Sequence, residues 1–170
     1  MKTEKVLIQK LKEHDEEAFD EIYQKYFRLV KHVAYQILPS EMLAEDIVQE
    51  TFFRMYQNIG SYQYDVSFSA WLCTIAKNLA LNESKKRNRN VPFPEYDTEK
   101  FSVAPQTENS GDLLQKVKDI LGEKDYNLVM LRLYHELSYK EISDITGESV
   151  AALTNRYHRA VKKLKGAIKL

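Results

Sequence analysis

The chain has 170 residues, of which 44% are hydrophobic, and its 25 basic and 25 acidic side chains give a net charge of zero. Five glycines and four prolines are too few for a turn-rich β fold, so the composition favours helices. A single cysteine, Cys73, excludes an intrachain disulfide framework and a cysteine zinc site. There is neither a secretory leader nor an apolar run of the ~18 residues that span a bilayer, so we expect a cytoplasmic protein without membrane insertion.

The zero net charge conceals an uneven distribution along the chain. Residues 1–87 carry 12 basic and 13 acidic side chains, residues 88–112 carry 2 and 5, and residues 113–170 carry 11 and 7. The last part therefore has a net charge of +4. Because affinity for nucleic acid depends on local neutralisation of phosphates, this distribution matters more than the total.

Apolar residues at three- and four-residue steps predict three helices at the start of the chain, over residues 2–13, 16–37 and about 41–59. Val6, Leu7 and Leu11 are the expected apolar positions of the first helix. Pro39-Ser40 ends the second helix, and Ser40 caps the third. The third helix has an apolar stripe and an opposite polar face, which is formed by Glu45, Asp46, Gln49 and Glu50. Such a face is usually solvated surface, and the alternative is a docking face for a basic partner.

A polar loop with two tyrosines, Ser61 to Ser67, precedes a fourth predicted helix over about residues 68–87. Basic residues cluster toward and past the end of this helix: Lys77, Lys85, Lys86, Arg87 and Arg89. An aromatic loop beside a basic helix is typical of proteins that bind single-stranded nucleic acid, where bases stack on rings. The alternative for Trp71 is a core side chain, on a helix whose positive C-terminal end simply suits the helix dipole.

Residues 88–112 hold three of the four prolines and show no helical period. This composition predicts an extended or disordered linker. The sequence therefore predicts an N-terminal helical domain over residues 1–87, the linker over 88–112 and a second helical domain over 113–170.

The second domain is expected to open with two short helices. The first has Leu113, Leu114, Val117, Ile120 and Leu121 on one face and is stopped by Gly122. The next, near residues 123–136, carries Tyr126, Val129, Met130 and Leu133 as its apolar positions.

Residues 137–165 have the pattern of a helix, a tight turn and a longer second helix. Ser138 and Glu141 form a capping box, Gly147 can adopt the positive φ of such a turn, and Ser149 is a second N-cap. In the second helix, an apolar stripe is expected at Val150, Leu153, Tyr157 and Leu164. This pattern is typical of DNA-binding helix-turn-helix motifs, and every charged residue from 149 to 170 is basic. The alternative is an ordinary helical hairpin with a solvated basic face.

The sequence contains no arrangement typical of catalysis. It has no glycine-rich phosphate loop, no nucleophile–base pair and no histidines at metal-ligand spacing. We therefore expect a protein that is not an enzyme and that has no cofactor and no metal.

Four segments resemble the extracytoplasmic-function (ECF) sigma factors of bacterial RNA polymerase: AEDIVQETFFRMY at 44–56, FSAWLCTIAKNLALN at 68–82, ELSYKEISDITG at 136–147 and NRYHRAVKKLK at 155–165. The resemblance implies an all-α fold with two small helical domains, sigma domain 2 and sigma domain 4, and a function in promoter-specific initiation of transcription. The competing class is a two-domain helix-turn-helix regulator that does not dock on core polymerase. It would need a ligand pocket or a heptad seam, and neither is evident.

The resemblance also implies partners and site residues. The partners are core RNA polymerase, promoter DNA and an anti-sigma factor. The residues that grip the clamp coiled coil of the polymerase large subunit are Asp46, Gln49 and Glu50. The residues that recognise the unpaired −10 strand and its flipped base are Tyr62, Tyr64, Trp71, Asn78, Asn82, Lys85, Lys86 and Arg87. The residues of the −35 recognition helix and its start are Ser149, Ala151, Ala152, Thr154, Asn155, Arg156, His158, Arg159 and Lys162.

Some of these positions carry finer expectations. Arg156 and Arg159 are expected on the exposed side of the recognition helix, where they can neutralise phosphates or make bidentate contacts with guanine. Asn78 is expected to reach a base, whereas Asn82 lies nearer the apolar stripe and the helix end. The family's T-V-K-S-R segment is replaced here by residues 152–156, ALTNR, so base preference does not transfer from relatives.

Overall fold

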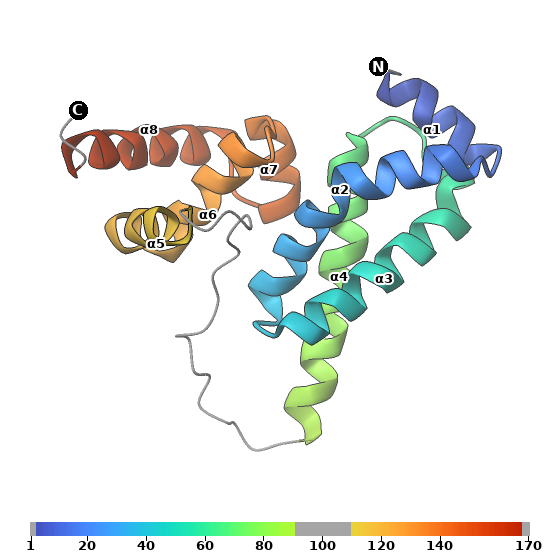
Figure 1. The fold of residues 1–170 in the computed structure, drawn as a ribbon, viewed down its shortest axis with the longest axis horizontal. Coiled ribbons are helices and arrows are strands. Elements are labelled where there is room, and N and C mark those ends of the chain that lie inside the picture. Colours follow the sequence, from blue (N-terminus) through green and yellow to red (C-terminus); the bar gives the residue numbers. More distant parts are fainter. Residues whose placement is uncertain (1–2, 91–109, 168–170) are drawn as a thin grey trace. The chain divides into compact units, whose positions relative to one another are not determined.

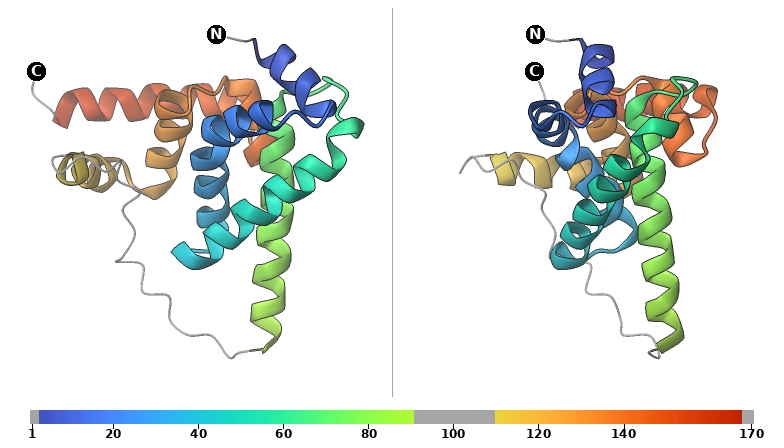
Figure 2. Two further views of the ribbon diagram at one scale, coloured as in Figure 1. Left: turned by 45° about the vertical axis from the view of Figure 1, so that its right-hand side comes forward. Right: turned by 90° about the vertical axis from the view of Figure 1, so that its right-hand side faces the viewer.

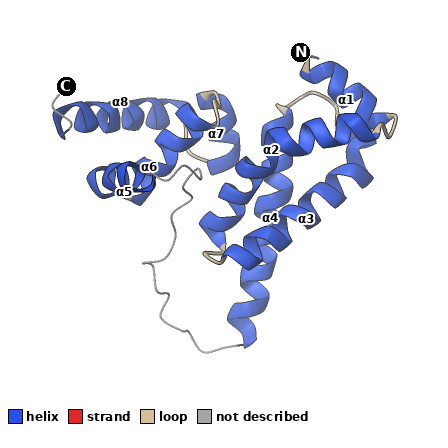
Figure 3. Cartoon of the chain, viewed as in Figure 1, coloured by secondary structure: helices blue, strands red, loops and turns tan. Residues whose placement is uncertain are grey.

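The computed structural model describes residues 3–90 and 110–167. These residues form α-helices with one short 3₁₀ turn and one π-helical turn, and no strand occurs within these ranges (Figures 1 and 3). The all-α fold class is thereby confirmed. The chain divides into two compact units, Met1–Thr98 and Glu99–Leu170. Most of the predicted linker, residues 91–109, lies outside the described residues.

The first unit is a bundle of four α-helices. Their bounds are α1 Glu4–Lys12, α2 Glu16–Ile37, α3 Glu41–Asn58 and α4 Phe68–Asn90, with a 3₁₀ turn, η1, at Ile59–Ser61. Helices α2, α3 and α4 pack against one another, and α1 packs on α2. The last turns of α4 extend beyond the first turn of α3 (Figures 1 and 2), so the basic end of α4 projects from the bundle.

Local caps and aromatic packing hold this bundle together. Ser40 accepts a hydrogen bond from the backbone N–H of Leu43 at 3.5 Å, which confirms it as the N-cap of α3. The core contains the fully buried rings of Phe52 and Phe68, and the side chain of Cys73 is also buried. Burial of such large apolar groups is the main favourable term in folding.

The predicted apolar face of the first helix was wrong by one position. Val6 is exposed, and the face that α1 packs on α2 consists instead of Leu7, Ile8 and Leu11. The reason is geometric: these three side chains are centred on one side of the helix, and Val6 is rotated away from it.

The second unit contains four further α-helices and the π-helical turn. Their bounds are α5 Ser110–Leu121, α6 Glu123–Val129, η2 Met130–Tyr134, α7 Tyr139–Thr146 and α8 Val150–Ala167. Helix α8 packs on α5, α6 and α7. One core cluster joins Leu121, Val129 and Ala160, and five partly buried side chains surround it: Val117, Ile120, Tyr126, Tyr157 and Leu164.

The π-helical turn overturns one predicted core position. Leu133 was expected on the apolar face, but its side chain is 60% exposed, and Leu128 and Leu131 are buried instead. The His135 N–H donates to the Met130 carbonyl five residues back, so the helix is wound more loosely there. The added residue in that turn rotates Leu133 out of the core.

The local signals of the helix-turn-helix are confirmed. Ser138 and Glu141 form the complete capping box, and Gly147 ends α7 in the left-handed conformation at φ 77°. The Ser149 hydroxyl accepts a hydrogen bond from the Ala152 N–H at 3.2 Å, so it caps α8. Val150, by contrast, is exposed and does not belong to the apolar stripe of α8.

None of the helices in residues 3–90 and 110–167 combines the length and the apolarity required of a membrane span.

Candidate functional site

The polar face of α3 divides into residues that are already paired and residues that are open. Lys31 forms ion pairs with Glu41 and, at 3.1 Å, with Glu45. Burial lowers the pKa of Lys31, but the hydrogen bonds and charges of these two carboxylates outweigh it, so the pKa is raised overall. Glu50 pairs with Arg54 at 2.6 Å.

Asp46 and Gln49 are exposed and have no hydrogen bond or ion pair with another described residue. Two large apolar side chains flank them on the same face: Met42 is 67% exposed and Phe53 is 56% exposed. The spacing 42, 46, 49, 53 follows steps of four, three and four, so these residues form one stripe along α3. Large apolar side chains that are exposed together beside polar groups are a mark of a protein-binding surface. Sequence reasoning missed Met42 and Phe53, although Phe53 lies outside the predicted inward stripe that contains Phe52.

The two tyrosines of the loop between α3 and α4 have different surroundings. Tyr62 is only 4% exposed; its hydroxyl donates to the Val66 carbonyl at 2.7 Å, and burial raises the pKa of its phenol. Its ring lies 5.2 Å from that of Trp71, and both rings pack near Phe68. Tyr62 and the half-buried Trp71 therefore belong to an aromatic cluster that fixes the loop.

Tyr64, in contrast, presents its ring to solvent. It is 42% exposed and has a φ of 59°, a conformation that bulky residues rarely adopt. The Lys12 ammonium lies 5.0 Å from the centre of this ring and also donates to the Tyr62 carbonyl at 2.7 Å. Helix α1 thus braces the loop, and the ring of Tyr64 stays partly exposed beside Lys12.

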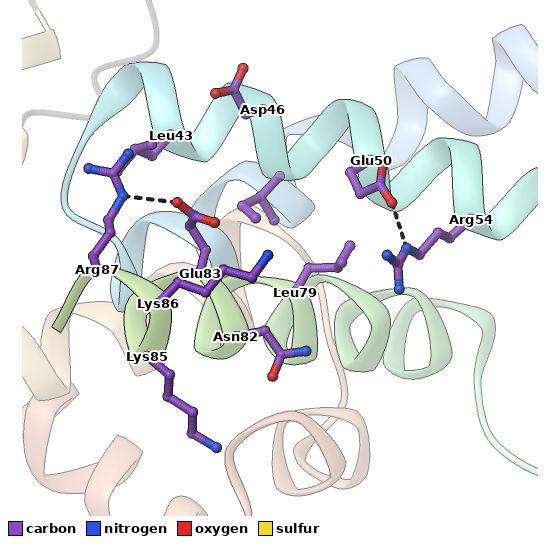
Figure 4. Close-up of a pocket in the computed structure, with 11 residues that line it drawn as sticks. Leu43, Asp46, Glu50, Arg54, Leu79, Asn82, Glu83, Lys85, Lys86 and Arg87 are labelled. Carbon is purple, nitrogen blue, oxygen red and sulfur yellow. Dashed lines mark hydrogen bonds and ion pairs between the residues drawn. The ribbon is translucent and has the colours of Figure 1, made fainter. Parts of the chain in front are cut away.

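A groove of about 650 Å³ runs between α3 and α4 (Figure 4). Its apolar floor is formed by Leu43, Ile47 and Leu79, and its polar walls by Asp46, Glu50, Arg54, Asn82, Glu83, Lys85, Lys86 and Arg87. The groove therefore brings together residues predicted for polymerase docking and residues predicted for the −10 strand. Asn78, Gln49 and the loop tyrosines do not line it.

The charges in the groove are partly neutralised. Arg87 pairs with Glu83 at 3.0 Å, and Arg54 pairs with Glu50. Lys85 and Lys86 are exposed, and Figure 4 shows Lys86 extending between the helices while Lys85 points away from α3. These two lysines give the end of α4 its uncompensated positive charge.

The predicted position of Asn82 near the end of its helix is wrong. Helix α4 continues to Asn90, so Asn82 lies two turns inside it. Both Asn78 and Asn82 are exposed, and neither has a hydrogen bond with another described residue.

The exposed face of α8 contains six of the residues predicted for −35 recognition: Ala151, Ala152, Asn155, His158, Arg159 and Lys162. Their three- and four-residue spacing places them on one side of the helix. Ser149 caps α8, and the Thr154 hydroxyl donates to the Val150 carbonyl at 2.8 Å, so their side-chain groups are already engaged.

The predicted placement of Arg156 on the exposed side of α8 is wrong. Its side chain is only 15% exposed, and it forms ion pairs with Asp125 of α6 and with Glu148 of the turn before α8. Arg156 follows Leu153 by three residues and precedes Ala160 by four, and both of these are buried. It therefore lies on the side of α8 that packs on the rest of the unit.

Among the described residues, no group of histidine, cysteine, aspartate or glutamate side chains is arranged to hold a metal ion.

Comparison with known families assigns a class to this arrangement. Residues 22–90 match the family described as Sigma-70 region 2, and residues 113–164 match Sigma-70, region 4. The first match covers most of the N-terminal bundle, including α3 and α4. The second match includes the helix-turn-helix of the second unit. The chain therefore has the architecture of a sigma-70-type factor.

Individual relatives narrow this class. The chain is 30% identical to the ECF RNA polymerase sigma factor SigW of Bacillus subtilis, over 93% of this chain and 92% of the relative. It is 27% identical to the ECF RNA polymerase sigma-E factor of Escherichia coli K12, over 93% and 90%. The chain belongs to the ECF family of RNA polymerase sigma factors.

The fold is also similar to that of a solved structure. The sigma factor RpoE from Bartonella quintana, solved in complex with the anti-sigma factor NepR, has a TM-score of 0.62 at 23% identity and covers 89% of this chain and 97% of that one. As an ECF sigma factor, the protein binds core RNA polymerase and promoter DNA and directs initiation of transcription. The competing class, a regulator that works without polymerase docking, is not supported.

Proposed function

We propose that three surfaces divide the work of this sigma factor. The stripe of Met42, Asp46, Gln49 and Phe53 on α3 docks on the clamp coiled coil of the polymerase large subunit. The exposed side of α4 and the ring of Tyr64 bind the unpaired −10 strand. The exposed face of α8 enters the major groove of the −35 element. The protein acts in the cytoplasm, by binding rather than by catalysis.

The observation that carries this proposal is the exposed stripe on α3. A helix in a bundle normally presents solvated polar groups outward, but here two large apolar side chains flank one free carboxylate and one free amide. The basic partners of Glu45 and Glu50 leave Asp46 as the available negative charge on this face. An apolar and acidic stripe fits a basic partner with exposed apolar residues of its own.

The chemistry of the DNA surfaces supports the other two assignments. An asparagine amide both donates and accepts, so Asn78 can bind the edge of an unpaired base. Tyr64 offers a ring on which a base can stack, and Lys85 and Lys86 can follow the phosphate backbone. On α8, Asn155 and Arg159 are one turn apart and can reach neighbouring base edges.

We further propose that an anti-sigma factor binds this chain. The support is that the RpoE relative of similar fold was solved in complex with an anti-sigma factor.

Replacement of Asp46 by lysine tests the docking surface. We expect Asp46→Lys to abolish co-purification with core polymerase, because it places a positive charge against a basic partner. A second variant, Phe53→Gln, should weaken binding by removing an apolar contact. Neither side chain is in the core, so the helical circular dichroism should not change.

Matched controls come from the same unit. Asp20→Lys makes the same charge change at an exposed carboxylate of α2, and Val6→Gln makes the same polar change at an exposed apolar side chain of α1. Both controls should bind core polymerase as the wild type does. Wild-type binding by Asp46→Lys and Phe53→Gln would place the docking surface elsewhere.

A further inference from the structure

The recognition helix α8 is tied to the rest of its unit by a three-residue ion-pair cluster. The Arg156 Nε lies 3.1 Å from the Asp125 Oδ1, and the Arg156 Nη1 donates a hydrogen bond to the Glu148 Oε2. The side chains of Asp125 and Glu148 are 29% and 30% exposed. One guanidinium therefore joins three elements: α6, the turn before α8, and α8 itself.

The geometry of this cluster can hold α8 at a fixed angle to α6. Arginine is planar and presents its donors in a rigid fork, so two carboxylates on different elements restrain it in two directions. The buried Arg156 Nε faces Asp125 at ion-pair distance without the alignment of a hydrogen bond. If one carboxylate is removed, the remaining one restrains the guanidinium in a single direction only.

The same cluster makes Arg156 unsuited to contact DNA. Two of its nitrogens, Nε and Nη1, already face carboxylates of its own unit, so a phosphate or a guanine would have to compete with these carboxylates. The neighbouring exposed residues Asn155 and Arg159 carry no such engagement with another described residue.

We propose that Arg156 is a positioning residue: through Asp125 and Glu148 it sets the angle at which α8 enters the −35 major groove, and the bases are read by its exposed neighbours. This inference rests on the proposed −35 contact of α8. A lysine at this position would keep the positive charge but not the role, because its ammonium lacks the planar fork that reaches both carboxylates.

The acidic partners provide the decisive test. If Arg156 contacted DNA, Asp125→Asn and Glu148→Gln would free its charge and remove negative charge from the neighbourhood of the phosphates, so promoter binding would tighten. If Arg156 positions α8, the same two changes weaken promoter binding, by about tenfold for a coupling typical of contacting residues. The two models therefore predict opposite signs.

The experiment uses the full chain assembled with core polymerase. The probe is a promoter duplex selected from a random library by the wild-type complex, and its Kd is measured at several salt concentrations. The variants are Asp125→Asn, Glu148→Gln, Arg156→Ala, the double variant Asp125→Asn/Arg156→Ala, and Arg159→Ala. Thermal unfolding shows that each binds as a folded protein.

We expect Asp125→Asn and Glu148→Gln each to weaken promoter binding. The double variant should bind no more weakly than Arg156→Ala alone. In these variants and in Arg156→Ala, the slope of log Kd against log salt concentration should equal that of the wild type. Arg159→Ala, as a base contact, should weaken binding by about tenfold and relax the sequence preference at one position. If Asp125→Asn and Glu148→Gln bind the promoter as tightly as the wild type, or more tightly, Arg156 is not a positioning residue. Because these two substitutions are isosteric, they give this answer even if Arg156→Ala does not fold. An Arg159→Ala variant that binds like the wild type would instead contradict the proposed −35 surface.

Discussion

His32 is a buried titratable residue in the N-terminal bundle. Its side chain is 5% exposed on α2, and desolvation lowers its pKa to about 4. In the unfolded chain a histidine has a pKa near 6.5. Below pH 6.5 the unfolded state therefore takes up a proton that the folded state does not, so the free energy of unfolding decreases as the pH falls toward 4.

This linkage predicts a pH-dependent stability that one substitution removes. Between pH 7 and pH 5, we expect His32 to account for a loss of about 2 kcal/mol in the free energy of unfolding. Urea unfolding followed by fluorescence of Trp71, the single tryptophan, reports on this unit. His32→Leu should lose that part of the pH dependence, whereas His14→Gln, at an exposed histidine, should keep it. Equal pH dependence in wild type and His32→Leu would contradict the shifted pKa.

Tyr64 combines backbone strain with a ring that is 42% exposed. A tyrosine at positive φ costs of the order of 1–3 kcal/mol, which glycine would not incur. We expect Tyr64→Gly to unfold at an equal or higher urea concentration than the wild type, yet to lose promoter opening. Tyr64→Phe, which keeps the ring, should retain both properties. A Tyr64→Gly variant that opens promoters normally would remove the stacking role.

Among the elements, the helix-turn-helix depends most clearly on backbone conformation. Gly147 adopts φ 77°, and apart from its two chain neighbours no described residue has an atom within 4 Å of the position that a Cβ would occupy. Gly147→Ala should therefore destabilise the second unit by about 1 kcal/mol through strain alone. Gly166, on α8, has equal space and an ordinary φ, so Gly166→Ala should be neutral or slightly stabilising. Hydrogen exchange of the α7 and α8 amides measures both effects; equal protection in the two variants would contradict this account.

Elements with strong local signals could be predicted from the sequence. The bounds of α2, the caps at Ser40, Ser138 and Ser149, and the left-handed Gly147 all follow from side chains that bond to the nearest backbone or from a missing Cβ. The π-helical turn could not be predicted, because it changes the winding without a distinctive residue, and Leu133 was misplaced in consequence.

The candidate site was harder to predict because pairing partners are distant in sequence. Arg156 and Asp125 are 31 positions apart, so the sequence alone gave no sign that the arginine is engaged. Its position three residues after Leu153 could have indicated the packed side of α8, but a basic helix favoured the exposed interpretation. The contact of Lys12 with the tyrosine loop could not be predicted either, because Lys12 and Tyr62 are also far apart in the sequence.

At the scale of the whole molecule, the proposed −10 and −35 surfaces lie on different compact units. Each unit has its own core, so a substitution on one surface should leave the other intact. Binding through two linked modules multiplies affinity when both can be engaged at once. Loss of one function with retention of the other is therefore the expected result of a surface substitution.

Promoter melting provides the clearest case. Asn78 is exposed on α4, outside the groove that Asn82 lines, and alanine there removes a donor and an acceptor while it favours the helix. We expect Asn78→Ala to bind core polymerase and the −35 duplex normally but to lose open-complex formation, because no amide captures the unpaired base. Permanganate footprinting of unpaired thymines measures this loss, and a template with a pre-melted bubble should partly restore transcription.

Two further variants, one control and one at a neighbouring asparagine, distinguish base capture by Asn78 from a general effect on α4. Asn58→Ala removes an exposed asparagine of α3 whose amide donates, among the described residues, to the Arg54 carbonyl alone, so the variant should melt the promoter as the wild type does. Asn82→Ala tests the neighbouring amide, one turn further along α4. If Asn78→Ala opens duplex promoters fully and Asn82→Ala does not, base capture belongs to the groove between α3 and α4, and the −10 strand must then pass beside Asp46 and Lys86 rather than over the middle of α4.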